Sequence, residues 1–268
     1  MGRRMKKISL ALLLMAGIGF AQAGELQDAQ KLWEGKEFYK AFQIFDKLAQ
    51  QGDVSAQWQL GEMYGFGEGT PEDPVKAEYW LKQAQAKGSP EAVASLAAVQ
   101  QRQKRRAEIA YYTANFDGAN AAYAKFGCIR PVIPARSTTN NDIKAVNASI
   151  AAWNECYDRF IANLRNVAPV DKTIDPAVLP LMNNDEFTKS SALIGKVYEK
   201  IMADARLIEK GISDESSSWK QETEQYAAAN NQKIKEIKAN TKNYIDLANM
   251  EQSELMRRTQ VKAVGMNK

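Results

Sequence analysis

The chain has 268 residues and contains no histidine. The lack of histidine excludes His-based acid–base catalysis, activation of a serine nucleophile by histidine, and most zinc and iron sites. The formal net charge is +4, from 36 basic and 32 acidic side chains. Four of the basic side chains lie close to the N-terminus, at Arg3, Arg4, Lys6 and Lys7.

Residues 1–23 have the three-part layout of a secretory signal peptide. The basic residues are followed by an apolar run from Ile8 to Phe20 and by the small-residue motif Ala21-Gln22-Ala23, which predicts cleavage after Ala23. The apolar run is shorter than the roughly 20 residues that a membrane span needs. We therefore expect a mature chain without a transmembrane span that is periplasmic or secreted; an uncleaved signal anchor is the alternative.

Removal of this peptide changes the electrostatic prediction. It takes four basic residues and no acidic ones, so the mature chain has 32 side chains of each sign and is formally neutral. The positive charge of the full chain therefore gives no reason to expect nucleic acid or an anionic membrane as a partner.

A register of 36 residues recurs in the first half of the chain. Ala41 is repeated by Ala77, Gly52 by Gly88, Ala56 by Ala92 and Leu60 by Leu96. A period of this length is typical of stacked helical repeats. The residues that make up the best unit are Ala56, Leu60, Gly61, Tyr64, Gly67, Gly69, Asp73, Ala77, Trp80, Ala84, Gly88 and Ala92.

The glycine-rich segment 65–71 is predicted to be the loop between the two helices of this unit. Its glycines can adopt positive φ, and Pro71 or Pro74 can begin the next helix. A phosphate-binding loop is the alternative. It is disfavoured because no strand precedes the segment, no Gly-Lys-Ser/Thr follows it, and Glu68, Glu72 and Asp73 would repel a phosphate.

The pattern from Ala56 to Ala92 resembles a Sel-one-like repeat, a relative of the tetratricopeptide repeat. Upstream, Leu32, Gly35, Phe38, Ala41 and Phe45 resemble an ordinary tetratricopeptide unit. Downstream, residues 116–119 with Tyr123 suggest a third, lengthened unit that closes at Gly127. The resemblance implies an all-α fold in which residues 24–127 form a short α-α solenoid of about three helix pairs. It also implies a non-catalytic adaptor without a cofactor, whose inner face binds proteins or peptides.

The basic run at residues 102–106 is predicted to lie on a helix. Its side chains would spread around most of the helical turn, so a solvated face is favoured over a patch for a partner.

Cys128 and Cys156 are the two cysteines of the chain. In an oxidising exported compartment, a disulfide between them is the favoured prediction. Two buried free thiols, or a redox site, are the alternatives.

The segment from Ile129 to Thr139 is predicted to be extended, because Pro131 and Pro134 restrict the backbone. Arg130 and Arg136 are candidate interaction residues that could present their guanidinium groups to a carboxylate or phosphate. Salt bridges to local acidic residues are the alternative, which we favour.

Residues 128–268 are predicted to form a helical C-terminal domain. A helix begins near Asn140 and carries an aromatic stripe that is predicted to be core rather than a ligand groove: Ile143, Val146, Ile150, Trp153, Tyr157, Phe160 and Leu164. A proline-containing connection leads to a helix that is expected to stop at Gly211, with a turn at residues 213–218. The last helix is long and polar, and we expect it to pack through Tyr244 to Leu247.

These predictions favour an exported helical-repeat protein that mediates protein–protein interaction with an unidentified envelope protein or peptide. One alternative is a structural subunit that forms homo-oligomers through the C-terminal helix. The other is a hydrolase of cell-wall glycan that uses paired carboxylates, although no spacing identifies its catalytic residues.

Overall fold

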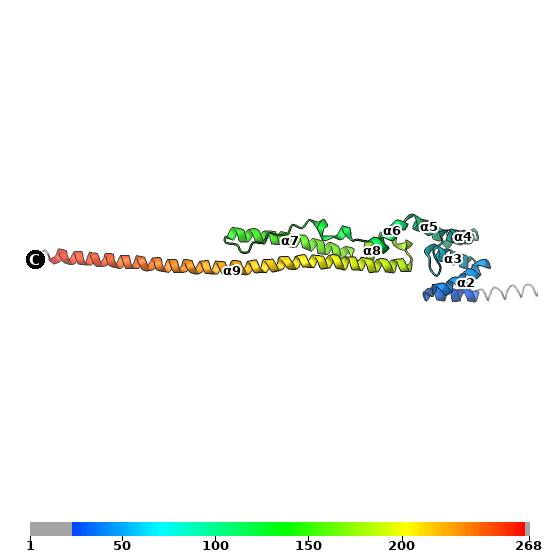
Figure 1. The fold of residues 1–268 in the computed structure, drawn as a ribbon, viewed down its shortest axis with the longest axis horizontal. Helices are drawn as coiled ribbons and strands as arrows, with labels where there is room; N and C mark the ends of the chain where they lie inside the picture. Colours follow the sequence, from blue (N-terminus) through cyan, green and yellow to red (C-terminus); the bar gives the residue numbers. More distant parts are fainter. Residues whose placement is uncertain (1–22, 266–268) are drawn as a thin grey trace, which may run out of the picture. The chain divides into compact units, whose positions relative to one another are not determined.

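The computed structural model describes residues 23–265, and side chains as far as Arg257 (Figure 1). The predicted signal peptide lies outside the described residues apart from Ala23. The described part is helical and contains no strand, so the all-α fold is confirmed. After a helix at residues 23–34, the elements are α2 (Phe38–Gln50), α3 (Val54–Phe66), α4 (Pro74–Ala86), α5 (Pro90–Lys104), α6 (Arg106–Ala110), η1 (Tyr111–Asn115), η2 (Ala119–Ala121), η3 (Tyr123–Phe126), α7 (Asn140–Val167), α8 (Val170–Thr173), η4 (Leu179–Leu181) and α9 (Asn184–Gly265).

The described chain divides into two compact units, and α7 and α9 each contribute to both. The first unit contains residues 23–121 and 163–200, and the second contains residues 122–162 and 201–265. Residues 163–200 thus group with the repeat region. Whether residues 24–127 and 128–268 fold as separate domains stays a prediction. Among the described helices, none combines the length and the apolar character that crossing a membrane requires.

Local sequence signals define the helix pairs of the first unit. The side chain of Asp53 accepts a hydrogen bond from the Ala56 N–H at 2.8 Å, and Ser89 accepts one from the Ala92 N–H at 3.2 Å. These N-caps satisfy backbone donors that the first helical turn leaves unpaired. The turns before them contain Gly52 and Gly88, with φ of 95° and 92°. The 36-residue register therefore reflects two equivalent turns followed by two capped helices.

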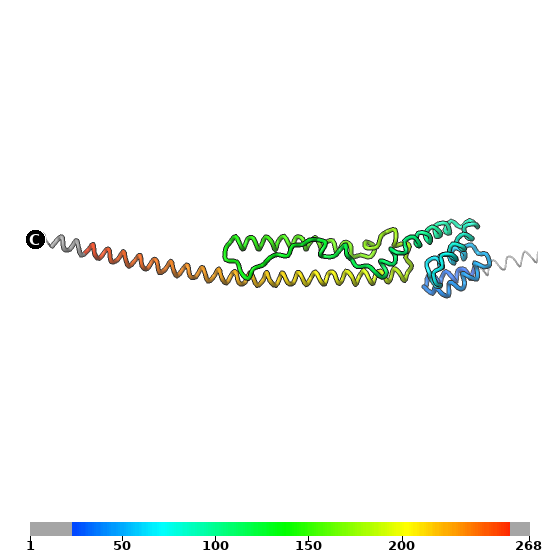
Figure 2. The backbone as a smooth tube through the Cα atoms, turned by 45° about the horizontal axis from the view of Figure 1, so that its top comes forward, coloured from blue at the N-terminus to red at the C-terminus, as the bar shows by residue number. Residues whose placement is uncertain are grey.

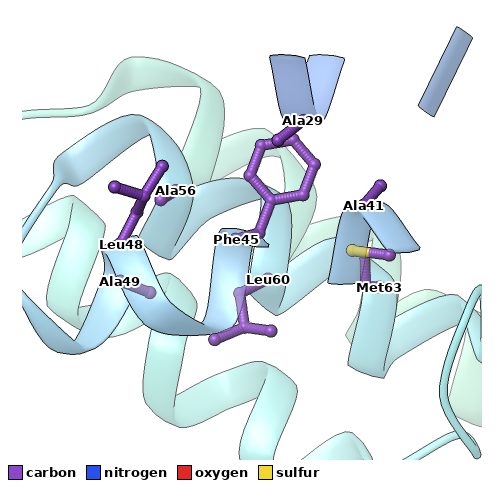
Figure 3. Packing of buried hydrophobic residues seen from close by; sticks show 8 residues of the cluster. All are labelled: Ala29, Ala41, Phe45, Leu48, Ala49, Ala56, Leu60 and Met63. Carbon is purple, nitrogen blue, oxygen red and sulfur yellow. The ribbon is translucent and has the colours of Figure 1, made fainter. Parts of the chain in front are cut away.

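The core of the first two pairs consists of small residues packed around a few large ones. Figure 3 shows eight of them, with the ring of Phe45 directed toward Ala29. Gly61 lies where α3 approaches α4, since a Cβ at this position would lie 2.6 Å from Cγ of Leu81. The eight residues are Ala29, Ala41, Phe45, Leu48, Ala49, Ala56, Leu60 and Met63.

The second helix of the predicted third unit, at residues 116–127, does not form. α5 begins like the first helix of a pair, but α6, η1, η2 and η3 that follow it are short. Phe116 has an extended backbone and packs against the rings of Tyr112 and Tyr198. The prediction was wrong because this aromatic residue is buried against a segment from later in the chain, and not in the register of the repeats.

The second unit contains residues 140–162 of α7 beside α9 (Figures 1 and 2). Trp153, Tyr157 and Phe160 are buried, which confirms the aromatic part of the stripe as core, whereas Ile143 and Ile150 are only half-buried. Tyr157 also donates a hydrogen bond to Glu209 at 2.9 Å, and burial together with this carboxylate raises the pKa of Tyr157 to about 12. The phenol is protonated at neutral pH, and the raised pKa extends its role as a hydrogen-bond donor to more alkaline conditions.

α9 continues without a break through the predicted turn at residues 213–218. Gly211 costs roughly 1 kcal/mol relative to alanine inside a helix. Ile212 and Trp219 are buried on either side of the predicted turn, and the Trp219 indole donates to the Ser137 hydroxyl at 3.0 Å. Burial of one large apolar side chain contributes about 1.5–3 kcal/mol, so tertiary packing outweighs the local stop signals.

The predicted packing of α9 through residues 244–247 was also wrong. Tyr244 is 79% exposed and Leu247 is 59% exposed. Within the described chain, this part of the helix has no layer of protein over it.

Candidate functional site

A groove of about 440 Å³ lies in the first unit, beside the first helices of successive pairs. Its walls are aromatic and methionine side chains, and its polar groups are carboxylates and amides. We call it the repeat groove, and its residues are Trp33, Glu62, Phe66, Glu68, Leu179, Met182, Asn183, Asn184 and Phe187.

The aromatic walls are fixed by helix ends and ring contacts. Trp33 packs edge-on against Phe38, with 4.8 Å between the ring centroids. Phe66 is the last residue of α3, which ends because Gly67 adopts a left-handed conformation with φ of 70°. The guanidinium of Arg102 lies 5.4 Å from the centroid of the Phe66 ring, a favourable cation–π distance. Both walls are thus held in place before any ligand is present.

Glu62 is the partly buried carboxylate of the groove. It accepts a hydrogen bond from the Ser95 hydroxyl at 2.6 Å, and the Trp58 indole donates to the same hydroxyl oxygen at 2.8 Å. Burial raises the pKa of Glu62 above its ordinary value, and the nearby charge of Glu68 acts in the same direction. A cationic group in the groove would relieve both effects.

Glu68 is the second carboxylate of the groove, and it lies in the loop after α3. It accepts hydrogen bonds from the side-chain amide of Asn184 at 2.7 Å and from the Asn184 backbone N–H at 3.3 Å. The neighbouring Asn183 donates from its side chain to the backbone carbonyl of Phe66 at 2.7 Å. These bonds hold the start of α9 against the end of α3.

Arg102 anchors the same segment to α5. Its guanidinium donates to the carbonyl of Leu181 at 2.6 Å, to Glu186 at 2.6 and 2.9 Å, and to Glu72 at 2.8 Å. Arg106 adds hydrogen bonds to Glu186 and Glu72 at 3.2 and 2.5 Å. Two arginines thus face two glutamates, and the cluster is electrically balanced.

This cluster corrects the prediction that the basic run is a solvated face. The side chain of Arg102 is fully buried, whereas Arg106 is about half exposed. Burial opposes ionisation of Glu186, but hydrogen bonds and charge from Arg102 outweigh it, so the pKa of Glu186 lies below its ordinary value. A buried guanidinium thus keeps this carboxylate ionised. We call Arg102, Arg106, Glu72 and Glu186 the clamp, because their hydrogen bonds hold α5 against the start of α9.

The repeat-signature residues support the fold and do not line the repeat groove. Ala56, Leu60, Ala77, Ala84 and Ala92 are fully buried. The others close turns, allow close helix approach, cap α4 or pack at the edge of the core: Gly61, Tyr64, Gly67, Gly69, Asp73, Trp80 and Gly88. The sequence thus revealed the scaffold. Glu62, Phe66 and Glu68 lie next to signature positions without belonging to the signature, and Trp33 follows Leu32 of the tetratricopeptide-like unit.

The second unit contains the predicted cysteine and arginine residues. A disulfide joins Cys128 to Cys156, whose Cα atoms are 5.5 Å apart. Arg130 forms an ion pair with Glu215 at 2.7 Å, and Arg136 lies over the ring of Tyr226 at 5.1 Å. Both arginines thus have local partners, and a role for them in binding another molecule stays a prediction.

The disulfide lies beside a mainly apolar groove of about 630 Å³ between the extended segment and α7. Ile129 and Val132 on its rim are largely exposed. Among the described residues, no group of three or more His, Cys, Asp or Glu side chains is arranged to hold a metal ion.

Comparison with known protein families identifies one segment of this architecture. Residues 54–89 match the model of the Sel1 repeat, which is the Sel-one-like repeat predicted above, and they comprise α3, α4 and the loop between them. The chain therefore contains a Sel1-like helical repeat, which suggests an adaptor role in protein–protein interaction. Sel1 repeats are generally non-catalytic. Neither the curated proteins nor the solved structures yielded a match.

Proposed function

We propose that this protein is exported and that its repeat groove binds a segment of a partner protein in the cell envelope, without catalysing a reaction. The observation that carries this proposal is the combination of aromatic walls and two carboxylates in the repeat groove, beside the first helix of the Sel1-like unit and the first helix of the preceding pair. A repeat array of this kind commonly presents such a surface to peptides.

The groove favours a partner segment that places a lysine or arginine beside a bulky apolar residue. Trp33, Phe66 and Phe187 supply apolar surface for the bulky side chain, and Phe187 is 44% exposed. Glu62 and Glu68 supply negative charge for the cation, and charge complementarity selects partners and speeds association.

The burial of Glu62 supports a binding role. A partly desolvated carboxylate reduces the stability of the free protein, because burial disfavours its ionised form. Perturbed carboxyl groups beside a groove are often found at functional sites. The lost stability would be regained when a bound cation neutralises Glu62.

Export is supported by the layout of residues 1–23 and by the disulfide between Cys128 and Cys156. Disulfides form and persist in oxidising compartments such as the periplasm. Mass analysis of the protein recovered from cell fractions tests this part of the proposal: an envelope protein that begins at Gly24 is expected. A cytoplasmic protein with residues 1–23 still attached would refute export.

Site-specific crosslinking tests the binding face. A photoreactive side chain is placed at Trp33 in the groove, or at Tyr79 on α4 as a control; Tyr79 is 55% exposed and does not line the groove. We expect a defined envelope protein to be crosslinked from position 33 and not from position 79. Equal crosslinking from both positions would place the interaction elsewhere.

A peptide panel then tests the chemistry. Peptides with a basic residue next to leucine or phenylalanine should bind the purified mature protein, and replacing the basic residue with glutamate should weaken binding about tenfold or more. Cleavage of cell-wall glycan by the purified protein, abolished by changing one carboxylate, would overturn the non-catalytic proposal.

A further inference from the structure

The distal part of α9 is a helix with an entirely exposed surface. Every residue from Ala227 to Arg257, which we call the distal segment, is exposed in the described chain. Isolated helices are marginally stable in water, and helices in proteins gain most of their stability from packing. A helix of this length is therefore expected to pack against another surface.

A stripe of mainly apolar residues runs along the distal segment at spacings of three and four residues, with Tyr244 and Ile245 adjacent at its centre. Such a pattern is typical of helices that pair. Ile237 is 63% exposed, Tyr244 is 79% exposed and Leu255 is 63% exposed. The positions of the stripe are Ile234, Ile237, Thr241, Tyr244, Ile245, Ala248, Gln252 and Leu255. Polar residues at some positions weaken the stripe, so charges must contribute to the choice of partner.

The charges of the distal segment form two blocks of opposite sign. Residues 233–242 contain four lysines and one glutamate, a net charge of +3, whereas residues 246–254 contain three acidic residues and no basic ones, a net charge of −3. The two blocks lie on either side of Tyr244 and Ile245. One helix thus carries both halves of a complementary pair.

We propose that the distal segment pairs with the distal segment of a second copy of this chain, and that the two helices run antiparallel. The two-fold axis would pass between Tyr244 and Ile245, so that each basic block faces the acidic block of the other copy. In this register Ile234 lies opposite Leu255, Thr241 opposite Ala248, and Tyr244 beside Ile245.

The register also brings opposite charges together at the edges of the stripe. Lys238 of each copy lies opposite Glu251 of the other, and Lys242 lies near Asp246 of the other. A parallel pair in register would place the lysines of one basic block beside the same lysines of the second copy, and like charges at an interface are unfavourable. The charge pattern therefore selects the antiparallel arrangement.

Charge reversal in the full mature chain tests this proposal. The first variant carries Lys238→Glu and Lys242→Glu, and the second carries Asp246→Lys and Glu251→Lys. Sedimentation velocity at low salt is expected to show a wild-type dimer, whose association weakens about tenfold or more in each variant alone, since attractive pairs become repulsive. Mixing the two variants in equal amounts should restore a dimer that contains one copy of each.

Cysteine substitution tests the direction of the helices independently. Tyr244→Cys lies beside the two-fold axis and should form an intermolecular disulfide under mild oxidation. Ile237→Cys should not, because the two copies of residue 237 would lie about 22 Å apart along the helix at 1.5 Å per residue. Circular dichroism checks that each variant keeps its helix content.

A wild-type chain that stays monomeric at all concentrations tested would overturn the proposal. So would a dimer that both charge-reversal variants form with unchanged affinity. Failure of the mixed variants to associate, together with efficient disulfide formation by Ile237→Cys, would show parallel pairing and refute the antiparallel arrangement.

Discussion

Arg102 on α5 donates hydrogen bonds to both carboxylate oxygens of Glu186, 84 residues later in the chain, at 2.6 and 2.9 Å. The bidentate geometry makes this link stronger and more directional than a single charged contact. Because the Arg102 side chain is fully buried and that of Glu186 is 16% exposed, water competes little for the pair. This contact fixes the start of α9 on the repeat helices and thereby forms one side of the repeat groove.

Replacement of Arg102 by alanine should destabilise the first unit strongly. Breaking a buried ion pair by removing one partner typically costs about 3–5 kcal/mol, and here Arg106 alone would be left to balance the charges of Glu72 and Glu186. We expect a loss in this range from chemical denaturation of Arg102→Ala. Lys104→Ala, on the exposed side of the same helix, is the matched control and should have little effect. If Arg102→Ala lowered the unfolding free energy as little as Lys104→Ala does, the clamp would contribute little to stability.

The stability that Glu186 contributes should depend on pH. Its pKa in the folded chain lies below the ordinary 4.5, so its ionised form is favoured by folding. The contribution is therefore fully present above about pH 4.5 and is lost as the pH falls through the lowered pKa. The difference in unfolding free energy between wild type and Glu186→Gln should be constant at neutral pH and should shrink in acid. A difference that grows on acidification would contradict this assignment.

The clamp also shows where sequence reasoning reaches its limit. Gly52, Gly88 and the caps that follow them are local features, so their 36-residue spacing predicted the helix pairs correctly. The basic run at residues 102–106 has no local feature that separates Arg102 from its neighbours. The burial of Arg102 depends on ion pairs with Glu72 and Glu186, which are distant in sequence. Helical periodicity within the run does not reveal these partners.

The disulfide should stabilise the second unit against unfolding. Cys128 and Cys156 are 28 residues apart, and closing a loop of this length contributes up to about 3.5 kcal/mol in the chain-entropy model. Reduction of the native protein, or the double substitution Cys128→Ser and Cys156→Ser, should lower the unfolding free energy by up to this amount. Intact mass before and after reduction and thiol alkylation is the direct check. A protein whose two thiols react with the alkylating reagent without reduction would contradict the disulfide.

In the long helix α9, the prediction from sequence failed for a different reason: the local signals were recognised, but packing overrides them. Gly211 and the serines at residues 213–218 are local signals that favour the end of a helix, yet α9 continues through them. Ser217 donates to the carbonyl of Ser213 at 2.8 Å and so satisfies its hydroxyl within the helix. Burial of Ile212 and Trp219 stabilises the continuous helix. Local propensity was overridden here by packing with segments that are remote in sequence.

Glu62→Gln separates stability from binding in the repeat groove. Because burial raises the pKa of Glu62, folding disfavours its ionised form. The resulting penalty is fully present above the raised pKa and disappears below the ordinary value of 4.5. Glutamine keeps an oxygen that can accept the Ser95 hydrogen bond but removes the charge. The variant should therefore be more stable than wild type at pH 7, and this advantage should vanish in acid.

The same variant should bind basic peptides about tenfold more weakly, because the groove loses one of its two negative charges. Glu34→Gln, an exposed residue outside the groove, is the matched control and should change neither property. Denaturation at several pH values and peptide titration by fluorescence anisotropy measure the two effects. A Glu62→Gln variant that is less stable at neutral pH yet binds normally would mean that Glu62 supports the fold through Ser95 and Trp58 and does not recognise a cation.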